Sequence, residues 1–158
     1  MACAPVSIAP EGQRADIVVG QLDIDMSAFA GIRGRSFTRT PAQVEADLRA
    51  ALENVPARSG PANTALSVKI GRIDLVSPGQ ALLIGGTSAM SAQIVLIDQA
   101  SRTQVTSPQD VIFLSERTRF GGIIGAATSP SAANDYQQSI NGFANRTYKA
   151  IYGSPPAS

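Results

Sequence analysis

The sequence predicts an α+β fold: a single β-α-β-β-β-α domain with a mostly antiparallel sheet and two helices on one of its faces. Two segments carry apolar residues at the three- and four-residue spacing of an amphipathic helix. Four other segments alternate apolar and polar residues with the period of a strand. Three of those strands follow one another in the middle of the chain, which favours an antiparallel meander with the helices packed against it.

The composition fits one domain and excludes several kinds of functional site. The chain has 158 residues, of which 44% are hydrophobic and 16% charged, so it can bury about two-thirds of the surface of its unfolded form. It has no His and one Cys, which excludes His-based triads, Cys-His dyads and zinc sites built from His or several Cys. The net charge of +1 argues against a dedicated nucleic-acid binder. No apolar run reaches the roughly 18 residues that a membrane span needs.

The first half of the chain predicts a strand, a loop and a helix. The strand is expected over residues 17–26, where apolar and polar side chains alternate. Residues 27–39 are rich in Gly, Arg and Ser and are expected to form a loop. Thr40 and Pro41 then open the first helix, and Gln43 completes a capping box. The apolar stripe of this helix consists of Val44, Leu48, Leu52 and Val55.

Three further strands are expected over residues 64–76, 88–97 and 103–116. In the first of these the alternation slips by one residue at Gly71, which predicts a β-bulge at that position. In the last, Pro108 predicts an edge position or a break, because proline has no N–H to donate to a neighbouring strand.

The last helix is expected to begin at a Ser129-Pro130 cap and to end at Gly153. Its apolar stripe consists of Ala133, Tyr136, Ile140, Phe143, Thr147 and Ile151. Its aromatic side chains, expected in the core and at its rim rather than in a ligand site, are Tyr136, Phe143, Tyr148 and Tyr152. We expect the stripes of both helices to pack on the same face of the sheet, against Leu66, Val68, Ile70, Ile94 and Leu96.

The N-terminal residues predict a lipid anchor. Residues 1–14 are expected to form a flexible tether with few core contacts, residues 15–153 the domain, and residues 154–158 a disordered tail. The only cysteine, Cys3, lies in this leader and follows Ala2, as in the last positions of a lipobox, where a small residue precedes the cysteine that receives the lipid. We therefore expect a lipid on Cys3 to anchor the domain without a spanning helix. The alternative is a cytosolic protein in which Cys3 is incidental.

The middle of the chain carries a resemblance to a family. Residues 81–116, ALLIGGTSAMSAQIVLIDQASRTQVTSPQDVIFLSE, are followed by FGGIIGAATSP and an amphipathic helix. A Gly turn at Gly85-Gly86, a strand ending at Asp98, a second strand and a loop at Gly121-Gly122 form a pattern that spans roughly residues 64–152. It resembles small bacterial cell-envelope lipoproteins of unknown function, similar to auxiliary lipoproteins of transport and secretion machinery. The resemblance implies no catalytic residues.

Several polar residues have both a functional and a structural interpretation. Asp23 and Asp25 share one face of the first strand and could bind a metal, but a solvated strand face is the simpler expectation. Asp98 is expected to hydrogen-bond its own backbone in a turn. The Gly-rich loops near residues 85–90 and 121–130 lack the Lys of a phosphate-binding P-loop.

Arginines are concentrated in two loops. The first loop holds Arg33, Arg35 and Arg39, and the second holds Arg117 and Arg119. These side chains could bind phosphate, lipid headgroups or an acidic partner. The simpler expectation is that they are solvated loop residues.

An uncharged apolar loop, residues 120–127, is the strongest candidate for a binding surface. Apolar area left in water is unfavourable, so its isoleucines should either fold back into the core or contact another protein. The candidate partner-binding residues, with neighbours from residues 82–84 and the second arginine loop, are Phe120, Ile123, Ile124, Leu83, Ile84, Arg117 and Arg119.

These observations predict a non-catalytic accessory or structural subunit of a bacterial envelope assembly, not an enzyme. It would lie in the periplasm, anchored through Cys3 to the inner or outer membrane, with other envelope proteins or a second copy of itself as partners. No cofactor, metal or nucleic acid is expected. The alternative is a small-ligand carrier or sensor with a groove between helices and sheet. A serine hydrolase is disfavoured, because no Ser lies in a GxSxG or SxxK motif.

Overall fold

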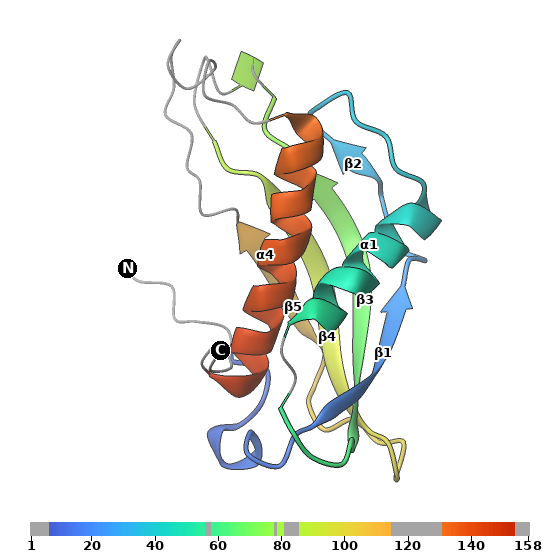
Figure 1. Ribbon diagram of the computed structural model, residues 1–158, viewed down its shortest axis with the longest axis vertical. Coiled ribbons are helices and arrows are strands. Elements are labelled where there is room, and N and C mark those ends of the chain that lie inside the picture. The colour runs from blue at the N-terminus through green and yellow to red at the C-terminus, as the bar shows by residue number, and fades with distance from the viewer. Residues whose placement is uncertain (1–6, 56–57, 78, 81–85, 115–130, 154–158) are drawn as a thin grey trace.

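The protein has two layers, a five-stranded sheet and the helices α1 and α4 on one of its faces (Figure 1). The computed structural model describes residues 7–55, 58–77, 79–80, 86–114 and 131–153. The α+β class and the helix positions agree with the sequence prediction. Within the described ranges, no helix combines the length and the apolar character needed to cross a membrane.

The sheet is mixed, and most of its paired residues are antiparallel, as the sequence predicts. Its strands are β1 (Val19–Asp25), β2 (Ile32–Arg33), β3 (Thr64–Asp74), β4 (Ala89–Asp98) and β5 (Gln109–Leu114). The predicted meander is confirmed, because β3, β4 and β5 are neighbours and antiparallel. However, β1 and β2 both pair in parallel with β3, because the chain crosses over through α1 before it returns to the sheet. The short strand β2 lies in the segment predicted to be a loop.

Two local features of the strands follow the sequence closely. The pairing of β3 with β4 shifts register between Ile70 and Arg72, which is the bulge predicted at Gly71. A Cβ atom on Gly71 would lie 2.9 Å from the hydroxyl of Ser91, so the close approach of β4 favours glycine there. Pro108 directly precedes β5, which is the last strand in the order of the sheet.

The helices begin and end at residues that satisfy their exposed backbone groups. Helix α1 (Pro41–Asn54) has the predicted capping box: the Gln43 N–H donates to the Thr40 hydroxyl over 3.2 Å, and the Thr40 N–H donates back to Gln43 over 3.0 Å. Helix α4 (Ala132–Tyr152) ends at Gly153, in a left-handed conformation with φ of 82°, as predicted. Its N-cap is Ser131 rather than the Ser129-Pro130 pair, because the Ser131 hydroxyl accepts the Asn134 N–H over 3.2 Å.

Both helical stripes pack on the same face of the sheet, as predicted, and form one core with it. Ala133, at the start of the α4 stripe, is exposed. The other side chains that the sequence assigns to this contact are buried, among them Val44, Leu48, Leu52, Leu66, Val68, Ile70, Ile94, Leu96, Tyr136, Ile140 and Phe143. Tyr148 is buried as well, and Tyr152 lies at the rim.

The other face of the sheet is mainly polar. Asp23 accepts a hydrogen bond from Ser67, and Asp25 lies 3.6 Å from the ammonium group of Lys69. Ile112 and Leu114 on β5 are 62% and 53% exposed and are the large hydrophobic side chains exposed among the described residues. The expectation of a solvated face for Asp23 and Asp25 is therefore confirmed.

The N-terminal segment packs more tightly than the sequence suggests. Ile8 and Ala9 are only 4% and 1% exposed and belong to the core. The backbone N–H of Ile8 donates to the carbonyl of Ala150, near the end of α4, over 3.0 Å. The expectation of few core contacts over residues 1–14 is wrong for these two residues, because they cover the end of the helix–sheet core.

Candidate functional site

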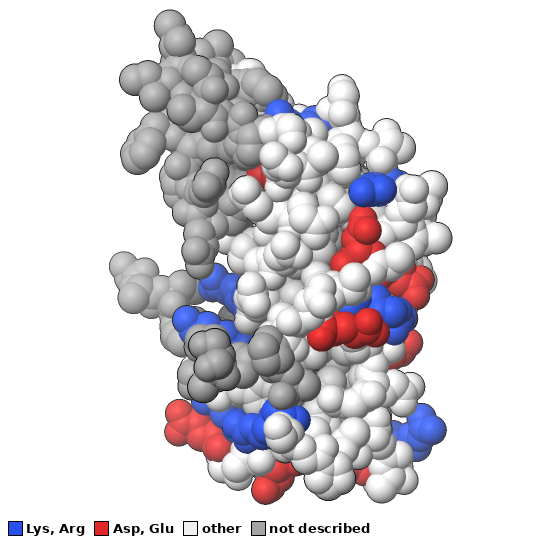
Figure 2. All heavy atoms as spheres, in the orientation of Figure 1, with Lys and Arg blue, Asp and Glu red and all other residues white. Residues whose placement is uncertain are grey.

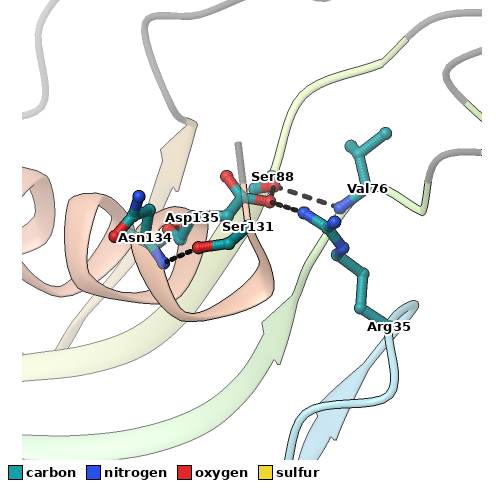
Figure 3. A network of polar contacts seen from close by, with 7 residues as sticks. Arg35, Val76, Ser88, Ser131, Asn134 and Asp135 are labelled. Atoms are coloured by element: carbon teal, nitrogen blue, oxygen red, sulfur yellow. Dashed lines mark hydrogen bonds and ion pairs between the residues drawn. The ribbon is translucent and has the colours of Figure 1, made fainter. Parts of the chain in front are cut away.

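The end of the domain where α4 begins joins parts of the chain that lie far apart in the sequence (Figure 3). We call this end the loop pole and define it by Arg35, Val76, Ser88, Ser131 and Asp135. Val76 follows β3 and Ser88 precedes β4, so they enclose the connection that contains residues 81–85. Residues 115–130 connect Leu114, at the end of β5, to Ser131. Leu114 pairs with Ala89, which is the residue after Ser88. The two apolar segments, residues 81–85 and 115–130, are therefore both flanked by described residues at the same end of the sheet.

A buried carboxylate stands at the centre of the loop pole. Asp135 is 1% exposed, and its Oδ2 accepts a 2.8 Å hydrogen bond from the Ser88 hydroxyl. The guanidinium of Arg35, 11% exposed, lies 3.8 Å from the same oxygen. The Ser88 hydroxyl also accepts the backbone N–H of Val76 over 3.1 Å. A buried charge is tolerated only when it is paired and hydrogen-bonded, and these contacts meet that need.

Local sequence places each group of this network. Ser131 starts α4, so Asp135 lies in its first turn, where the positive end of the helix dipole favours a carboxylate. Gly34 has φ of 89°, and a Cβ on it would lie 1.8 Å from the carbonyl oxygen of Leu75. Only glycine lets the chain pass this close to the end of β3, and the turn that follows directs Arg35 toward α4 (Figure 3).

A hollow of about 360 Å³ lies beside the network, lined by Gly34, Arg35, Ser36, Ser77 and Ala132. Arg35 is the charged group in this lining, and its charge is compensated by Asp135. Among the described residues, the lining contributes hydroxyl groups from Ser36 and Ser77. The contacts of the neighbouring network hold segments of the chain together.

A second cluster fixes the loop that precedes α1. Tyr136 donates a 2.9 Å hydrogen bond to Asp47, whose carboxylate lies 3.5 Å from Arg39. The Arg39 guanidinium lies 5.8 Å from the ring centres of both Phe37 and Tyr136, and these rings are 5.0 Å apart. Burial and the nearby charge of Asp47 raise the pKa of Tyr136 above its usual value. This cluster ties α1, α4 and the loop together.

The structure changes the interpretation of the first arginine loop. Arg33 is exposed, as expected of a solvated side chain. Arg35 instead forms the buried pair with Asp135, and Arg39 packs over two aromatic rings. The expectation of solvation is therefore wrong for Arg35, whereas Arg39, with 37% of its side chain exposed, remains partly solvated.

Asp98 has the role predicted for it. Its carboxylate accepts hydrogen bonds from the backbone N–H of Ser101, over 2.7 Å, and from the Ser101 hydroxyl, over 2.8 Å. These bonds lower the pKa of Asp98. Asp98 thus shapes the turn after β4.

The remaining candidates lie outside the described residues. They are Cys3 and the proposed partner-binding residues Phe120, Ile123, Ile124, Leu83, Ile84, Arg117 and Arg119. The structure locates only the points at which their segments join the domain.

Sequence reasoning missed Ser88, Asp135 and Asp47 as members of polar clusters. One signal was available for Asp135, since an acidic residue follows a Ser cap within the first turn of a helix. No local pattern marks Ser88, because its partner Asp135 is 47 residues away in the sequence.

The opposite end of the domain, where α4 ends, is held by two arginines. We call it the anchor pole and define it by Ser7, Ile8, Arg14, Arg58 and Tyr152. The Arg14 guanidinium donates to the carbonyl of Ala9 over 3.0 Å and to the Ser7 hydroxyl. Arg58 donates to the carbonyl of Arg14 over 2.6 Å and lies 4.9 Å from the ring centre of Tyr152. These contacts fix the N-terminal segment beside the last turn of α4.

Comparisons with known proteins give distant likenesses only. No family model and no curated protein matches the chain. A Xanthomonas campestris protein of the DUF330 family is similar over 86% of each chain, with 13% identity and a TM-score of 0.47. A candidate lipoprotein from Caulobacter crescentus CB15 covers 82% of this chain and 88% of its own, with 18% identity and a TM-score of 0.33.

Proposed function

We propose that the protein is a non-catalytic accessory or structural subunit of a bacterial envelope assembly, held in the periplasm by a lipid on Cys3. The observation that carries this proposal is the convergence of both apolar segments at the loop pole. The contacts Val76–Ser88 and Ser88–Asp135 measure 3.1 and 2.8 Å, so the ends of the two segments are clamped together. Such an arrangement suits one composite surface for a protein partner.

The polar groups of the loop pole and of the second cluster, before α1, support a structural role. Asp135 is compensated by Arg35 and Ser88, and Asp47 by Arg39 and Tyr136. Each of these carboxylates is engaged by groups that hold segments of the chain together. Catalytic acids and bases need instead a partner whose proton they can exchange with a substrate.

The alternative, a carrier with a groove between helices and sheet, has less support. Among the described residues, the side chains between these layers are fully buried and pack against one another, as Leu48, Leu66, Ile94 and Ile140 illustrate with 0% exposure. A ligand there would have to displace core side chains.

The proposal is tested on the native assembly. Membranes of the native host, extracted with mild detergent, should contain the protein in a species larger than a single copy. The double variant Ile123→Ser/Ile124→Ser should release it from this species without lowering its melting temperature. A matched control, Ile112→Ser/Leu114→Ser, makes the same kind of change on exposed residues of β5 and should keep the assembly.

Two results would contradict the proposal. If only the β5 variant loses the assembly, the partner contacts the open face of the sheet instead of the apolar segments at the loop pole. Early melting of the double isoleucine variant, with assembly intact, would place these isoleucines in the core. The lipid is tested separately by mass spectrometry of the Cys3 peptide from the native host, where an unmodified thiol would exclude the anchor.

A further inference from the structure

We infer that, in the anchored protein, the anchor pole faces the membrane and the loop pole points away from it. The inference rests on the proposed lipid at Cys3 and deepens it by naming the surface that meets the bilayer. It follows from three features: where the described N-terminal segment leaves the domain, how few residues lie between Cys3 and Ser7 in the sequence, and how the charges of the described residues are distributed.

The exit point of the leader is fixed. Ile8 is buried and bonded to Ala150, and Arg14 holds Ser7 and Ala9 on the same side of the helix end. Arg58 in turn bonds the backbone of Arg14 and packs on Tyr152. The leader therefore starts from the C-terminal end of α4 and cannot swing to another part of the surface without breaking these contacts.

The leader is short compared with the domain. Three residues lie between Cys3 and Ser7, so their Cα atoms are four steps apart and a fully extended chain spans at most about 14 Å. Helix α4 has 21 residues, which corresponds to a length of about 30 Å, and it runs along the longest axis of the molecule (Figure 1). A lipid on Cys3 thus holds the anchor pole close to the headgroups, while the loop pole lies roughly one helix length beyond it.

The charges give no reason for the domain to lie flat on the membrane. The two arginines of the anchor pole, Arg14 and Arg58, are engaged in the contacts that hold the N-terminal segment. Over the helix-bearing face, basic and acidic side chains are intermixed (Figure 2), with ion pairs such as Arg49–Glu45 at 3.2 Å. The net charge of the chain is only +1, so the overall attraction of the domain to anionic lipid is weak. The short leader, rather than charge, sets the orientation.

The consequence concerns the partner. Residues 81–85 and 115–130 both begin and end at the loop pole, which is the end far from the anchoring membrane. A protein that binds the loop pole would then lie in the space beyond that membrane.

The chain offers a clean test because it contains one Cys and no Trp. Coupling purified protein through Cys3 to a maleimide lipid in vesicles reproduces the anchor independently of native lipidation. Two single-Trp variants then report on the two poles. Tyr152→Trp lies at the anchor pole, and Phe37→Trp lies beside Tyr136, 5.0 Å away by ring centres. Residues 136 and 152 are separated by about 24 Å along α4.

The measurement is energy transfer from each Trp to a dansyl lipid in the same vesicles. We expect transfer to be several-fold greater for Tyr152→Trp than for Phe37→Trp, and to be alike in zwitterionic and anionic vesicles. Equal transfer from the two sites, or greater transfer from Phe37→Trp, would overturn the inference. Equal transfer from the two sites on anionic vesicles only would also overturn the inference, because charge would then set the orientation.

Two controls keep the outcome decisive. Circular dichroism establishes that each variant is folded, and Ser59→Trp, an exposed neighbour of Arg58, replaces Tyr152→Trp if that change disturbs the helix end. Because the vesicle experiment supplies the lipid chemically, it tests orientation alone. Mass spectrometry of native Cys3 tests the anchor alone, so failure of one is distinguishable from failure of the other.

Discussion

The hydroxyl of Ser88 donates a 2.8 Å hydrogen bond to the carboxylate of Asp135. This bond joins the start of β4 to the first turn of α4, and the same hydroxyl accepts the backbone N–H of Val76. The Ser88 side chain thus joins both ends of the β3–β4 connection to α4, the helix that follows residues 115–130. The arrangement of the loop pole depends on this contact.

Removal of the Asp135 carboxylate should strongly destabilise the domain. Asp135→Ala takes away the group that compensates Arg35 and Ser88 in buried surroundings, so the free energy of unfolding should fall by about 3–5 kcal/mol. Urea unfolding followed by circular dichroism measures the loss. Asp25→Asn changes a carboxylate of an exposed ion pair and should leave the urea midpoint almost unchanged. Equal midpoints for Asp135→Ala and the wild type would show that the network does not hold the loop pole.

Truncation of the helical stripes tests how α1 and α4 pack. Leu48 and Ile140 are both 0% exposed, and replacing either by Ala should lower the free energy of unfolding by about 2–5 kcal/mol through lost burial and a cavity. Ile112→Ala, at a position 62% exposed, is the matched control and should change stability little. An unchanged melting temperature in Leu48→Ala would mean that α1 does not cover the sheet.

Gly142 sets two effects against each other. Alanine is favoured over glycine in a helix by about 1 kcal/mol, yet a Cβ on Gly142 would lie 2.1 Å from the ring of Phe113 on β5. We expect the clash to dominate, so that Gly142→Ala lowers the melting temperature. The second change Phe113→Leu should recover part of the loss in a double-mutant cycle.

A control on the same helix separates these effects. Asn145 is exposed on α4, so Asn145→Ala should raise stability slightly through helix propensity alone. A gain in stability for Gly142→Ala as well would show that β5 gives way easily and that α4 is not fixed against it.

The buried tyrosines predict a loss of stability at high pH. Burial, with smaller effects of Tyr152 and Glu53, raises the pKa of Tyr148 to about 12, and burial with Asp47 raises that of Tyr136. The unfolded chain loses these protons near pH 10, whereas the folded chain retains them, so unfolding releases protons above that pH. The stability is therefore fully present below about pH 10 and falls as the pH rises toward the folded pKa.

This loss is measured by melting temperature between about pH 8 and pH 12, with tyrosinate absorbance on the same samples. Tyr148→Phe cannot ionise and should melt with a weaker dependence on alkaline pH than the wild type. The same slope in both proteins would contradict the assignment of the effect to Tyr148.

Features defined within one turn or one strand were predictable from the sequence. The capping box of Thr40 and Gln43 needs only residues three apart, and the bulge at Gly71 shows as a slip in the alternation of one strand. Gly153 ends α4 as expected, because its left-handed conformation suits glycine. These signals lie in the local order of residues, which a sequence displays directly.

Features defined by distant partners were not predictable. Alternation along β1 shows which face is buried, but not that its neighbour is β3 in parallel orientation. Arg35 looks like any other loop arginine, since its partner Asp135 belongs to another element far along the chain. Ile8 and Ala9 are two apolar residues before a proline, too few for a periodic pattern, and their burial depends on the end of α4.

The bond between Ile8 and Ala150 also imposes an order in time. Its acceptor is synthesised about 140 residues after its donor, and at roughly 5–20 residues per second this interval lasts on the order of ten seconds. Throughout that interval the N-terminal segment has no helix end to dock on. Ile8 therefore docks only after nearly the whole chain has been made, so the closing of the anchor pole is a late step in folding.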